Sequence, residues 1–327
     1  MRKVALISGI TGQDGSYLAE QLIEKDYEVH GLLRRSSTFN TARLEALYRS
    51  TELEQKIHLH YADSADSLHL YQVIQEITPD EIYNLAALSH VAQSFDQPEY
   101  AAETAGLGLL RILETLRLTK IPCRVYQAST SELFGSTPPP QSEMSKFNPQ
   151  SPYASAKLYA HETARIYREA FGIFVSTGIL FNHESPRRGR SFVTRKITTA
   201  VAEIMKGRRN TLVLGNLLAR RDWGYAPEYT DAMWRILQLH EPQDLVVATG
   251  TQYSVADFCN FAFSSVGLDW EKYTVTSSQF ERPLEVESLC GDSSRMFDAT
   301  GWKANKLAPE IAQIMVQADL EREYYLY

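Results

Sequence analysis

The sequence contains little cysteine and no long apolar run. Its 327 residues include three cysteines, Cys123, Cys259 and Cys290, which are so far apart that neither a disulfide framework nor a zinc-ligand spacing is expected. No stretch approaches the roughly 18 consecutive apolar residues that span a bilayer. The apolar segment after Lys3 breaks at Ser8 without the pattern of a signal-peptide cleavage site. We therefore expect a cytoplasmic protein without a membrane partner.

The chain also lacks an excess of positive charge. Its net charge is -7, whereas a general nucleic-acid binder normally carries a basic face that neutralises phosphates. We therefore expect no nucleic-acid partner. With 44% hydrophobic and 22% charged residues, the chain has the composition of a globular protein. Its length suffices for one large domain or two unequal ones.

A strand, a glycine turn and a helix are predicted at the start of the chain. The apolar residues 4–7 lead into Gly9, Gly12 and Gly15, and residues 17–25 have helical amphipathic spacing. Glycines let the backbone turn tightly and approach a pyrophosphate, and the N-terminus of the following helix attracts anions. This order of elements predicts a dinucleotide site.

The residues after the second predicted strand indicate which dinucleotide binds. NAD-binding folds usually place an acidic residue here to bind the ribose 2'-hydroxyl. After the strand at residues 27–33, this chain instead has Arg34, Arg35, Ser36 and Ser37. Because guanidinium and hydroxyl groups suit a 2'-phosphate, the sequence favours NADP over NAD.

Strands and helices continue to alternate along the first half of the chain. This alternation predicts an α/β fold, a Rossmann-type doubly wound parallel sheet with a smaller, mixed C-terminal substrate region. We expect residues 1–180 to form the NADP-binding domain, residues 225–250 to return to it, and residues 181–327 mainly to bind the substrate. The further strands are expected at residues 57–61, 81–85, 123–128 and 173–180, and the further helices at 67–77, 99–117 and 157–169.

Four polar side chains between Tyr126 and Lys157 form a candidate catalytic set. Tyr153 and Lys157 are four residues apart and share one face of a helix. The ammonium favours the phenolate and is expected to lower the phenol pKa, so that Tyr153 can take a proton from a substrate hydroxyl. Thr130 and Glu132 are two residues apart, and we expect both on one side of an extended strand. Glu132 permits removal of a proton next to a ketone and loss of water, which an epimerase or a reductase does not need.

The remaining motifs predict an anionic substrate and no metal. His183-Glu184 lies in a segment, residues 181–189, that is expected to be a loop, and Arg187 stands where a zinc site would have its second histidine. Short basic and aromatic motifs follow, at residues 192–196, 220–224 and 282–286. Recurring arginines in such motifs favour a sugar nucleotide.

Six motifs along nearly the whole chain resemble one known family. They are Gly9–Ser16, Arg34–Ser37, Tyr126–Glu132, Phe181–Arg188, Phe192–Lys196 and Arg221–Gly224. Together they resemble the GDP-mannose 4,6-dehydratases, which are extended short-chain dehydrogenases/reductases. The resemblance implies tightly held NADP and a cycle of C4 oxidation, C5/C6 elimination of water and return of the hydride to C6.

The resemblance also implies roles for individual residues. The catalytic residues would be Thr130, Glu132, Tyr153 and Lys157. The cofactor would be held by Gly9, Thr11, Gly12, Gln13, Asp14, Arg35, Asp63, Leu85, Ser89, Tyr100, Lys157, His183 and Arg188. The GDP-sugar would be held by Asn182, Val193, Lys196, Gly215, Arg221, Arg282 and Glu285.

The family also forms tetramers in which the segment after Arg35, here residues 36–48, reaches towards a neighbour's cofactor. We therefore expect a homotetramer or at least a homodimer. The chain departs from the family pattern at Leu88, where the family commonly has Gln, at Ala62 and Ser64 beside Asp63, and at Ala154. Because the loop at Leu88 is expected near the sugar, dehydration of a GDP-heptose is a second hypothesis. An epimerase or reductase is a third, and a non-enzymatic nucleotide sensor is a fourth.

Overall fold

A seven-stranded parallel sheet forms the centre of the protein. The computed structural model describes residues 2–34, 41–48, 55–280 and 283–322. All strands of the sheet are parallel, in the order β10-β6-β5-β4-β1-β2-β3. From β1 the chain adds β2 and β3 on one side and then β4, β5 and β6 on the other, as in a Rossmann fold, so the predicted fold class is confirmed. The strands are β1 (Val4–Ser8), β2 (Glu28–Leu33), β3 (Ile57–Tyr61), β4 (Glu81–Asn84), β5 (Arg124–Ala128), β6 (Val175–Leu180) and β10 (Asp244–Val247).

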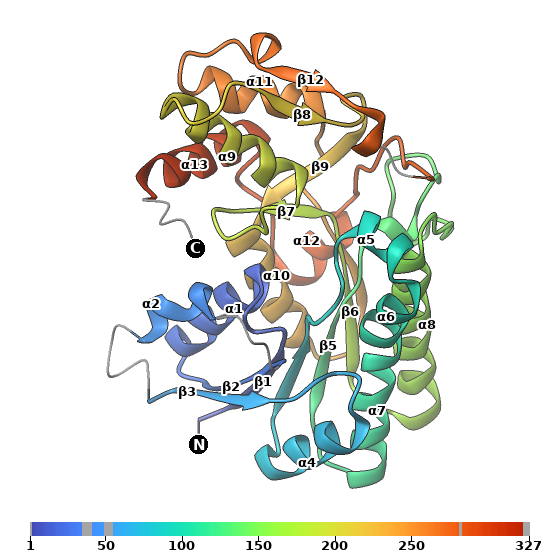
Figure 1. Ribbon diagram of the computed structural model, residues 1–327. Coiled ribbons are helices and arrows are strands. Elements are labelled where there is room, and N and C mark those ends of the chain that lie inside the picture. Colours follow the sequence, from blue (N-terminus) through green and yellow to red (C-terminus); the bar gives the residue numbers. More distant parts are fainter. Residues whose placement is uncertain (1, 35–40, 49–54, 281–282, 323–327) are drawn as a thin grey trace.

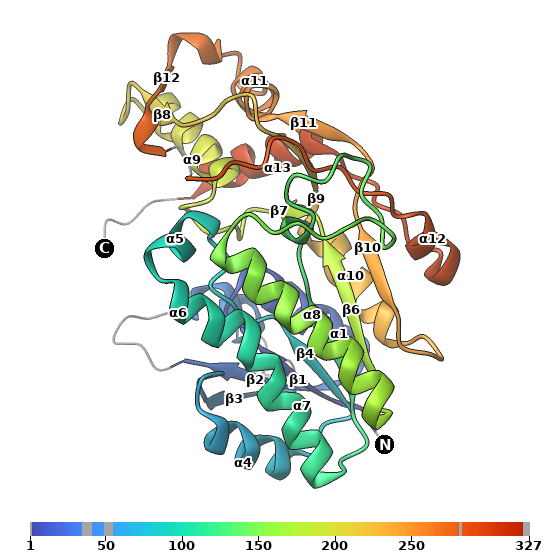
Figure 2. The ribbon, with the colours of Figure 1, turned by 90° about the vertical axis from the view of Figure 1, so that its right-hand side faces the viewer.

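Helices cover both faces of this sheet (Figures 1 and 2). Every residue of β4 and β6 is buried, as expected of strands between two helical layers. On one face pack α1 (Gln13–Glu24) and α10 (Ala226–Leu237). On the other pack α4 (Ser67–Ile77), α7 (Gly108–Thr119) and α8 (Pro152–Phe171). None of the helices in the described ranges has the length and apolar composition needed to cross a bilayer.

A smaller layer lies over the carboxyl ends of the parallel strands (Figure 1). Its core lies between three helices, α9 (Val193–Met205), α11 (Val255–Ser264) and α13 (Ala308–Glu321). It contains two small sheets. One has the strand order β11-β9-β7, and its strands are β11 (Gln252–Ser254), β9 (Arg220–Tyr225) and β7 (Asn182–Glu184). The other pairs β12 (Thr274–Thr276) with β8 (Leu212–Leu214). Between these strands and helices the chain returns to the large sheet through α10 and β10, which pairs with β6. The short helices are α2 (Glu45–Tyr48), α5 (Val91–Asp96), α6 (Pro98–Ala101) and α12 (Ser294–Thr300).

A helix start, a helix interior and a predicted loop differ from the sequence prediction. Helix α1 begins at Gln13 rather than at residue 17, because Gly12 already takes the extended N-cap conformation. The helix predicted at residues 99–117 is divided by a π-helical segment, Ala102–Leu107, between α6 and α7. Residues 182–184 form strand β7 rather than a loop, because they pair with β9.

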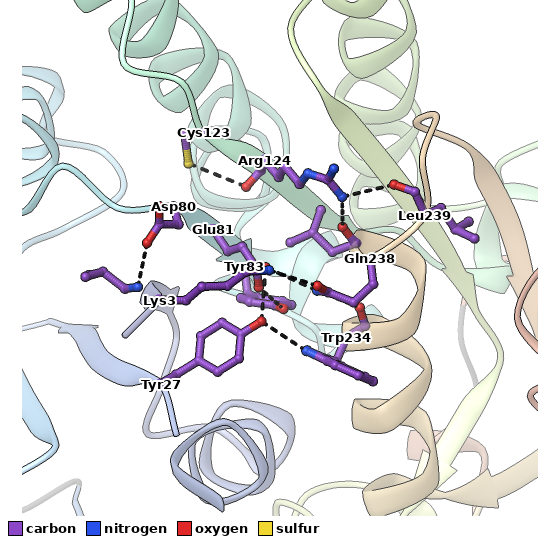
Figure 3. Close-up of polar contacts among 12 residues, drawn as sticks. Lys3, Tyr27, Asp80, Glu81, Tyr83, Cys123, Arg124, Trp234, Gln238 and Leu239 are labelled. Carbon is purple, nitrogen blue, oxygen red and sulfur yellow. Dashed lines mark hydrogen bonds and ion pairs between the residues drawn. The ribbon is translucent and has the colours of Figure 1, made fainter. Parts of the chain in front are cut away.

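A buried polar network connects the amino ends of the strands to α10 (Figure 3). The Glu81 carboxylate, 1% exposed, accepts hydrogen bonds from Lys3 Nζ at 2.8 Å and from the hydroxyls of Tyr83 and Tyr27 at 2.7 and 3.1 Å. Trp234 Nε1 on α10 donates to the Tyr27 hydroxyl at 3.2 Å. A buried carboxylate needs several partners. This network therefore fixes the amino ends of β1 and β4, which are the strand ends opposite the glycine turn.

Candidate active site

A cavity of about 710 Å³ lies between the carboxyl ends of the parallel strands and the smaller layer. Its lining includes every described residue that the sequence assigned to catalysis, cofactor or substrate. Such a volume fits the usual range of ligand pockets. Arg35 and Arg282, which were assigned to cofactor and substrate, lie outside the described residues, as do Ser36 and Ser37.

The glycine turn between β1 and α1 forms one end of the cavity. Gly9 has φ +73°, and a Cβ there would lie 3.0 Å from the backbone nitrogen of Ala86. A Cβ on Gly15 would lie 2.4 Å from the carbonyl oxygen of Gly9, so glycine is required at both positions. Gly12 caps α1 without a side chain. The turn, including Thr11, therefore offers helix N-H groups to an anionic group in the cavity, which fits a dinucleotide pyrophosphate.

Other predicted cofactor residues follow β2, β3 and β4. Arg34, after β2, donates to the Tyr100 hydroxyl at 2.7 Å. The carboxylate of Asp63, after β3, accepts from the backbone N-H of Ala65 at 2.9 Å. Leu85 and Ser89 line the cavity after β4. Parallel strands end at one edge of the sheet, which explains why residues so far apart in sequence meet here.

A buried pair connects β7 to the start of α1. His183 Nε2 lies 2.9 Å from Asp14 Oδ2, and its Nδ1 lies 2.7 Å from the carbonyl oxygen of Phe181. The His183 ring stacks on Tyr229 with centroids 4.6 Å apart. Burial raises the pKa of Asp14, but His183, together with a hydrogen bond from Gln13 and the charge of Arg188, lowers it to a net value below the ordinary one. Burial lowers the pKa of His183, and Asp14 raises it to a net value above the ordinary one.

The Tyr153 and Lys157 side chains both enter the cavity from the first turns of α8. Ser151 caps this helix by accepting from the N-H of Ala154 at 3.1 Å, and Lys157 Nζ donates to the carbonyl oxygen of Ala128 at 2.7 Å. Burial lowers the pKa of Lys157 to about 8. Burial raises the pKa of Tyr153 to about 12, although its hydrogen bond with Thr130 opposes this shift. The expected lowering of the phenol pKa is therefore wrong for the protein alone, because burial outweighs the favourable contacts.

Thr130 and Glu132 line the cavity, but not from an extended strand. Residues Ser131–Leu133 form a 3-10 turn, and the Thr130 hydroxyl caps it by accepting from the N-H of Glu132 at 3.2 Å. The predicted alternation along a strand is wrong here because the chain turns directly after Thr130. Glu132 is 7% exposed, and its negative charge contributes to the raised pKa of Tyr153. The Glu132 carboxylate therefore lies close enough to the Tyr153 phenol to affect its pKa.

Cationic groups from the smaller layer line the opposite end of the cavity. Arg221 on β9 forms an ion pair with Glu285 at 3.1 Å. Lys196 Nζ on α9 lies 3.5 Å from the centre of the Phe280 ring, and burial lowers its pKa. A Cβ on Gly215 would lie 2.6 Å from the carbonyl oxygen of Phe280, so this approach requires glycine. Asn182 and Val193 also line this end.

The sequence analysis missed several residues that shape the cavity. Arg43 donates to the carbonyl oxygens of Arg187 and Thr11 at 2.7 and 3.1 Å, beside the glycine turn of its own chain. Glu184 is buried and lies 3.1 Å from Arg188 Nε, so it orients a predicted cofactor ligand. No spacing signal marks Arg43, because its contacts join segments distant in sequence. Glu184 is only four residues from Arg188, and its part in the site was missed because this segment was expected to be a loop. Leu88, in contrast, is not among the residues that line the cavity.

Comparisons with known proteins identify the family. Residues 6–315 match the family described as GDP-mannose 4,6 dehydratase. The chain is 51% identical over 326 residues to GDP-mannose 4,6 dehydratase 2 of Arabidopsis thaliana, covering 98% of this chain and 87% of the relative. It is 48% identical over 342 residues to GDP-mannose 4,6 dehydratase of Homo sapiens, covering 98% and 92%.

A solved structure, RMD from Pseudomonas aeruginosa complexed with NADPH, has the same fold with a TM-score of 0.81. The identity is 21%, and the match covers 99% of both chains. The fold, the cavity and a match over nearly the whole sequence agree: this chain belongs to the GDP-mannose 4,6-dehydratase family.

Proposed function

We propose that this protein is an NADP-dependent hydro-lyase that converts GDP-mannose into GDP-4-dehydro-6-deoxy-mannose and water. One observation carries the proposal: the buried carboxylate of Glu132 shares a cavity with Thr130, Tyr153 and Lys157. The last three residues suffice for oxidation or reduction of a hydroxyl. A base beside them is what elimination of water requires in addition. Relatives about half identical over the whole chain are named as this dehydratase.

The glycine turn and its neighbours would hold NADP. Gly9, Thr11, Gly12, Gln13 and Asp14 would contact its pyrophosphate side, and Arg34 and Arg35 favour a 2'-phosphate. When bound, the oxidised nicotinamide supplies positive charge and accepts the C4 hydride, which is later returned to C6. The other residues proposed to bind the cofactor are Asp63, Leu85, Ser89, Tyr100, Lys157, His183 and Arg188.

Tyr153 would act first, as the base for the C4 hydroxyl. Burial raises its pKa to about 12, so positive charge in the cavity is needed before the phenolate forms. Thr130, which shares a hydrogen bond with Tyr153, would hold the same substrate hydroxyl. Lys157, whose pKa is lowered to about 8, would supply an ammonium in the same cavity at neutral pH. Together these groups would move one proton from the C4 hydroxyl to Tyr153.

Glu132 would act second, on the ketone formed at C4. The ketone acidifies the C5 proton, Glu132 removes it, and the C6 hydroxyl leaves with this proton as water. The proton that Tyr153 took from the C4 hydroxyl accounts for the proton that is delivered to C5 when C6 is reduced. Since the hydride is returned, the reaction consumes no cofactor.

The GDP-sugar would lie along the cationic end of the cavity. Arg221, Lys196 and Arg282 suit the diphosphate, and Asn182, Val193, Gly215 and Glu285 complete the proposed substrate contacts. In this arrangement residues 1–180 together with 225–250 bind the cofactor, and residues 181–327 bind mainly the GDP-sugar. The return of α10 and β10 to the large sheet supports this division.

Mass spectrometry of the product tests the proposed function. Purified protein incubated with GDP-mannose should give a product lighter by one water, and the same assay with a GDP-heptose tests the second sugar. If neither sugar loses water, the dehydratase proposal fails. An epimerase would give a product of unchanged mass, and a nucleotide sensor would give no product.

We also propose a cytoplasmic homotetramer. The cysteine content supports a reducing compartment, and Cys123, Cys259 and Cys290 are free. The family resemblance supports the tetramer, through the segment at residues 36–48. Light scattering should give the mass of four 37.1 kDa chains; a single-chain mass would exclude every oligomer.

A further inference from the structure

Two neighbouring strands bring a group of imidazoles together outside the cavity. Glu28 and His30 are two residues apart on β2, and His58 and His60 are two residues apart on β3. In the parallel register His30 pairs with His58. Because side chains alternate along a strand, all four lie on one face of the sheet, next to its edge strand β3.

Three ligand atoms of this group already have metal-site spacing. Glu28 Oε1 lies 3.2 Å from His30 Nε2 and 3.5 Å from His58 Nε2. All three atoms lie within 4.8 Å of one another, an arrangement that occurs at this one place in the described part of the chain. Ligands of tetrahedral zinc, each about 2.0–2.2 Å from the metal, are separated by roughly 3.3–3.5 Å. Two of the three separations therefore fit zinc, and a small side-chain rotation closes the third.

His60 completes the group as a second-layer partner. His30 Nδ1 lies 2.9 Å from His60 Nε2, and the two rings stack with centroids 5.1 Å apart at 15°. A metal-binding histidine usually donates its other ring N-H to such a partner, which fixes its tautomer and orientation. If His30 Nδ1 carries the proton, its Nε2 lone pair points towards Glu28 and His58.

A metal ion can reach this group of side chains from solvent. The His58 and Glu28 side chains are 44% and 40% exposed, so an ion can enter from solvent and keep a water ligand.

We propose that Glu28, His30 and His58 bind one divalent transition-metal ion, preferably zinc, and that His60 orients His30. Two imidazoles and one carboxylate favour zinc, copper or cobalt over magnesium or calcium, which prefer oxygen ligands alone. The sequence alone suggested no metal, because these residues are divided between two strands. The ion would connect β2 to β3, whose ends carry the cavity residues Arg34 and Asp63.

Cobalt and zinc binding to the full chain test this proposal. Chelator-treated protein titrated with Co²⁺ should develop the visible bands of a tetrahedral site at one ion per chain, and Zn²⁺ should displace the cobalt. Zn²⁺ should also raise the melting temperature, and Mg²⁺ should not. Absence of saturable binding of one ion per chain would overturn the proposal.

Variants locate the site. H30Q and H58Q should each abolish the cobalt bands, and H60Q should weaken zinc binding about 10–100-fold, as expected for a partner of a ligand. H240Q, at an exposed histidine outside the group, is the matched control and should bind as the wild type does. Melting curves without metal verify that each variant is folded. Unchanged cobalt bands in a folded H58Q protein would overturn the assignment, as would their loss in H240Q.

Discussion

Replacing Glu132 by Gln separates the two halves of the proposed reaction. The change preserves shape at a side chain that is 7% exposed, and it removes only the base and its charge. A positioned general base contributes about 10²–10⁴-fold to a proton transfer, which corresponds to about 3–5 kcal/mol of activation free energy. Loss of water and exchange of the C5 hydrogen should both slow by this factor.

Oxidation at C4 should survive the same substitution. The charge of Glu132 contributes to the raised pKa of Tyr153, so its removal lowers the phenol pKa and favours the phenolate. Reduction of bound NADP in a single turnover, followed by absorbance, should therefore be at least as fast as in the wild-type enzyme.

The assay follows GDP-mannose in heavy water by mass spectrometry, which reports dehydration and deuterium entry at C5 together. The matched control is Glu132→Asp, which keeps a carboxylate and should retain part of the activity. A Glu132→Gln protein that dehydrates GDP-mannose at the wild-type rate would refute the role of Glu132 as the base.

Four further predictions concern the buried pair, the cofactor and the smaller layer. Asp14→Asn should lower the pKa of His183 from above its ordinary value to below it, because burial and the charge of Arg188 then outweigh the hydrogen bond with Phe181; the imidazole signal in an NMR titration reports this. In the wild type the contribution of the pair to stability should be complete between the ordinary pKa values of Asp and His. It should be lost as the pH falls through the lowered pKa of Asp14 or rises through the raised pKa of His183; stability measured against pH checks this window. Arg34→Ala should weaken NADP binding about 10–100-fold and NAD binding less, if a charged hydrogen bond of about 1.5–3 kcal/mol to the 2'-phosphate is lost; calorimetry compares the two cofactors. Asp319→Ala should destabilise the protein by about 3–5 kcal/mol in urea unfolding, because its ion pair with Arg195 at 2.5 Å is buried and the guanidinium would keep its charge. An unchanged urea midpoint would contradict the last prediction.

Much of the fold followed from local pattern. Strand β3 and helix α4 have the bounds predicted from apolar spacing, since both are short, regular elements with clear ends. Helix α1 begins four residues earlier than predicted, because the glycine turn suppresses the apolar pattern in the first turn of the helix. Strand β7 was missed because three residues form a strand only when β9 is beside them.

The candidate site was partly predictable for a similar reason. Residues just after parallel strands meet at one edge of a sheet, so the positions of the motifs, together with the family resemblance, indicated which side chains line the cavity. The contacts of Arg43 were not predictable, since they join segments that only the fold brings together. The burial of Glu184 beside Arg188 was not predictable because it depends on strand β7. The turn at residues 131–133 was missed because Thr130 caps it with its own hydroxyl.

The sequence by itself determined the order of strands and helices, the glycine turn and the candidate catalytic set, because these depend on local spacing and residue type. Only the tertiary structure decided the protonation of Tyr153, Lys157 and His183, because burial and charges from distant segments set their pKa values. It also decided the grouping of Glu28, His30 and His58, because the register between two strands places their side chains together.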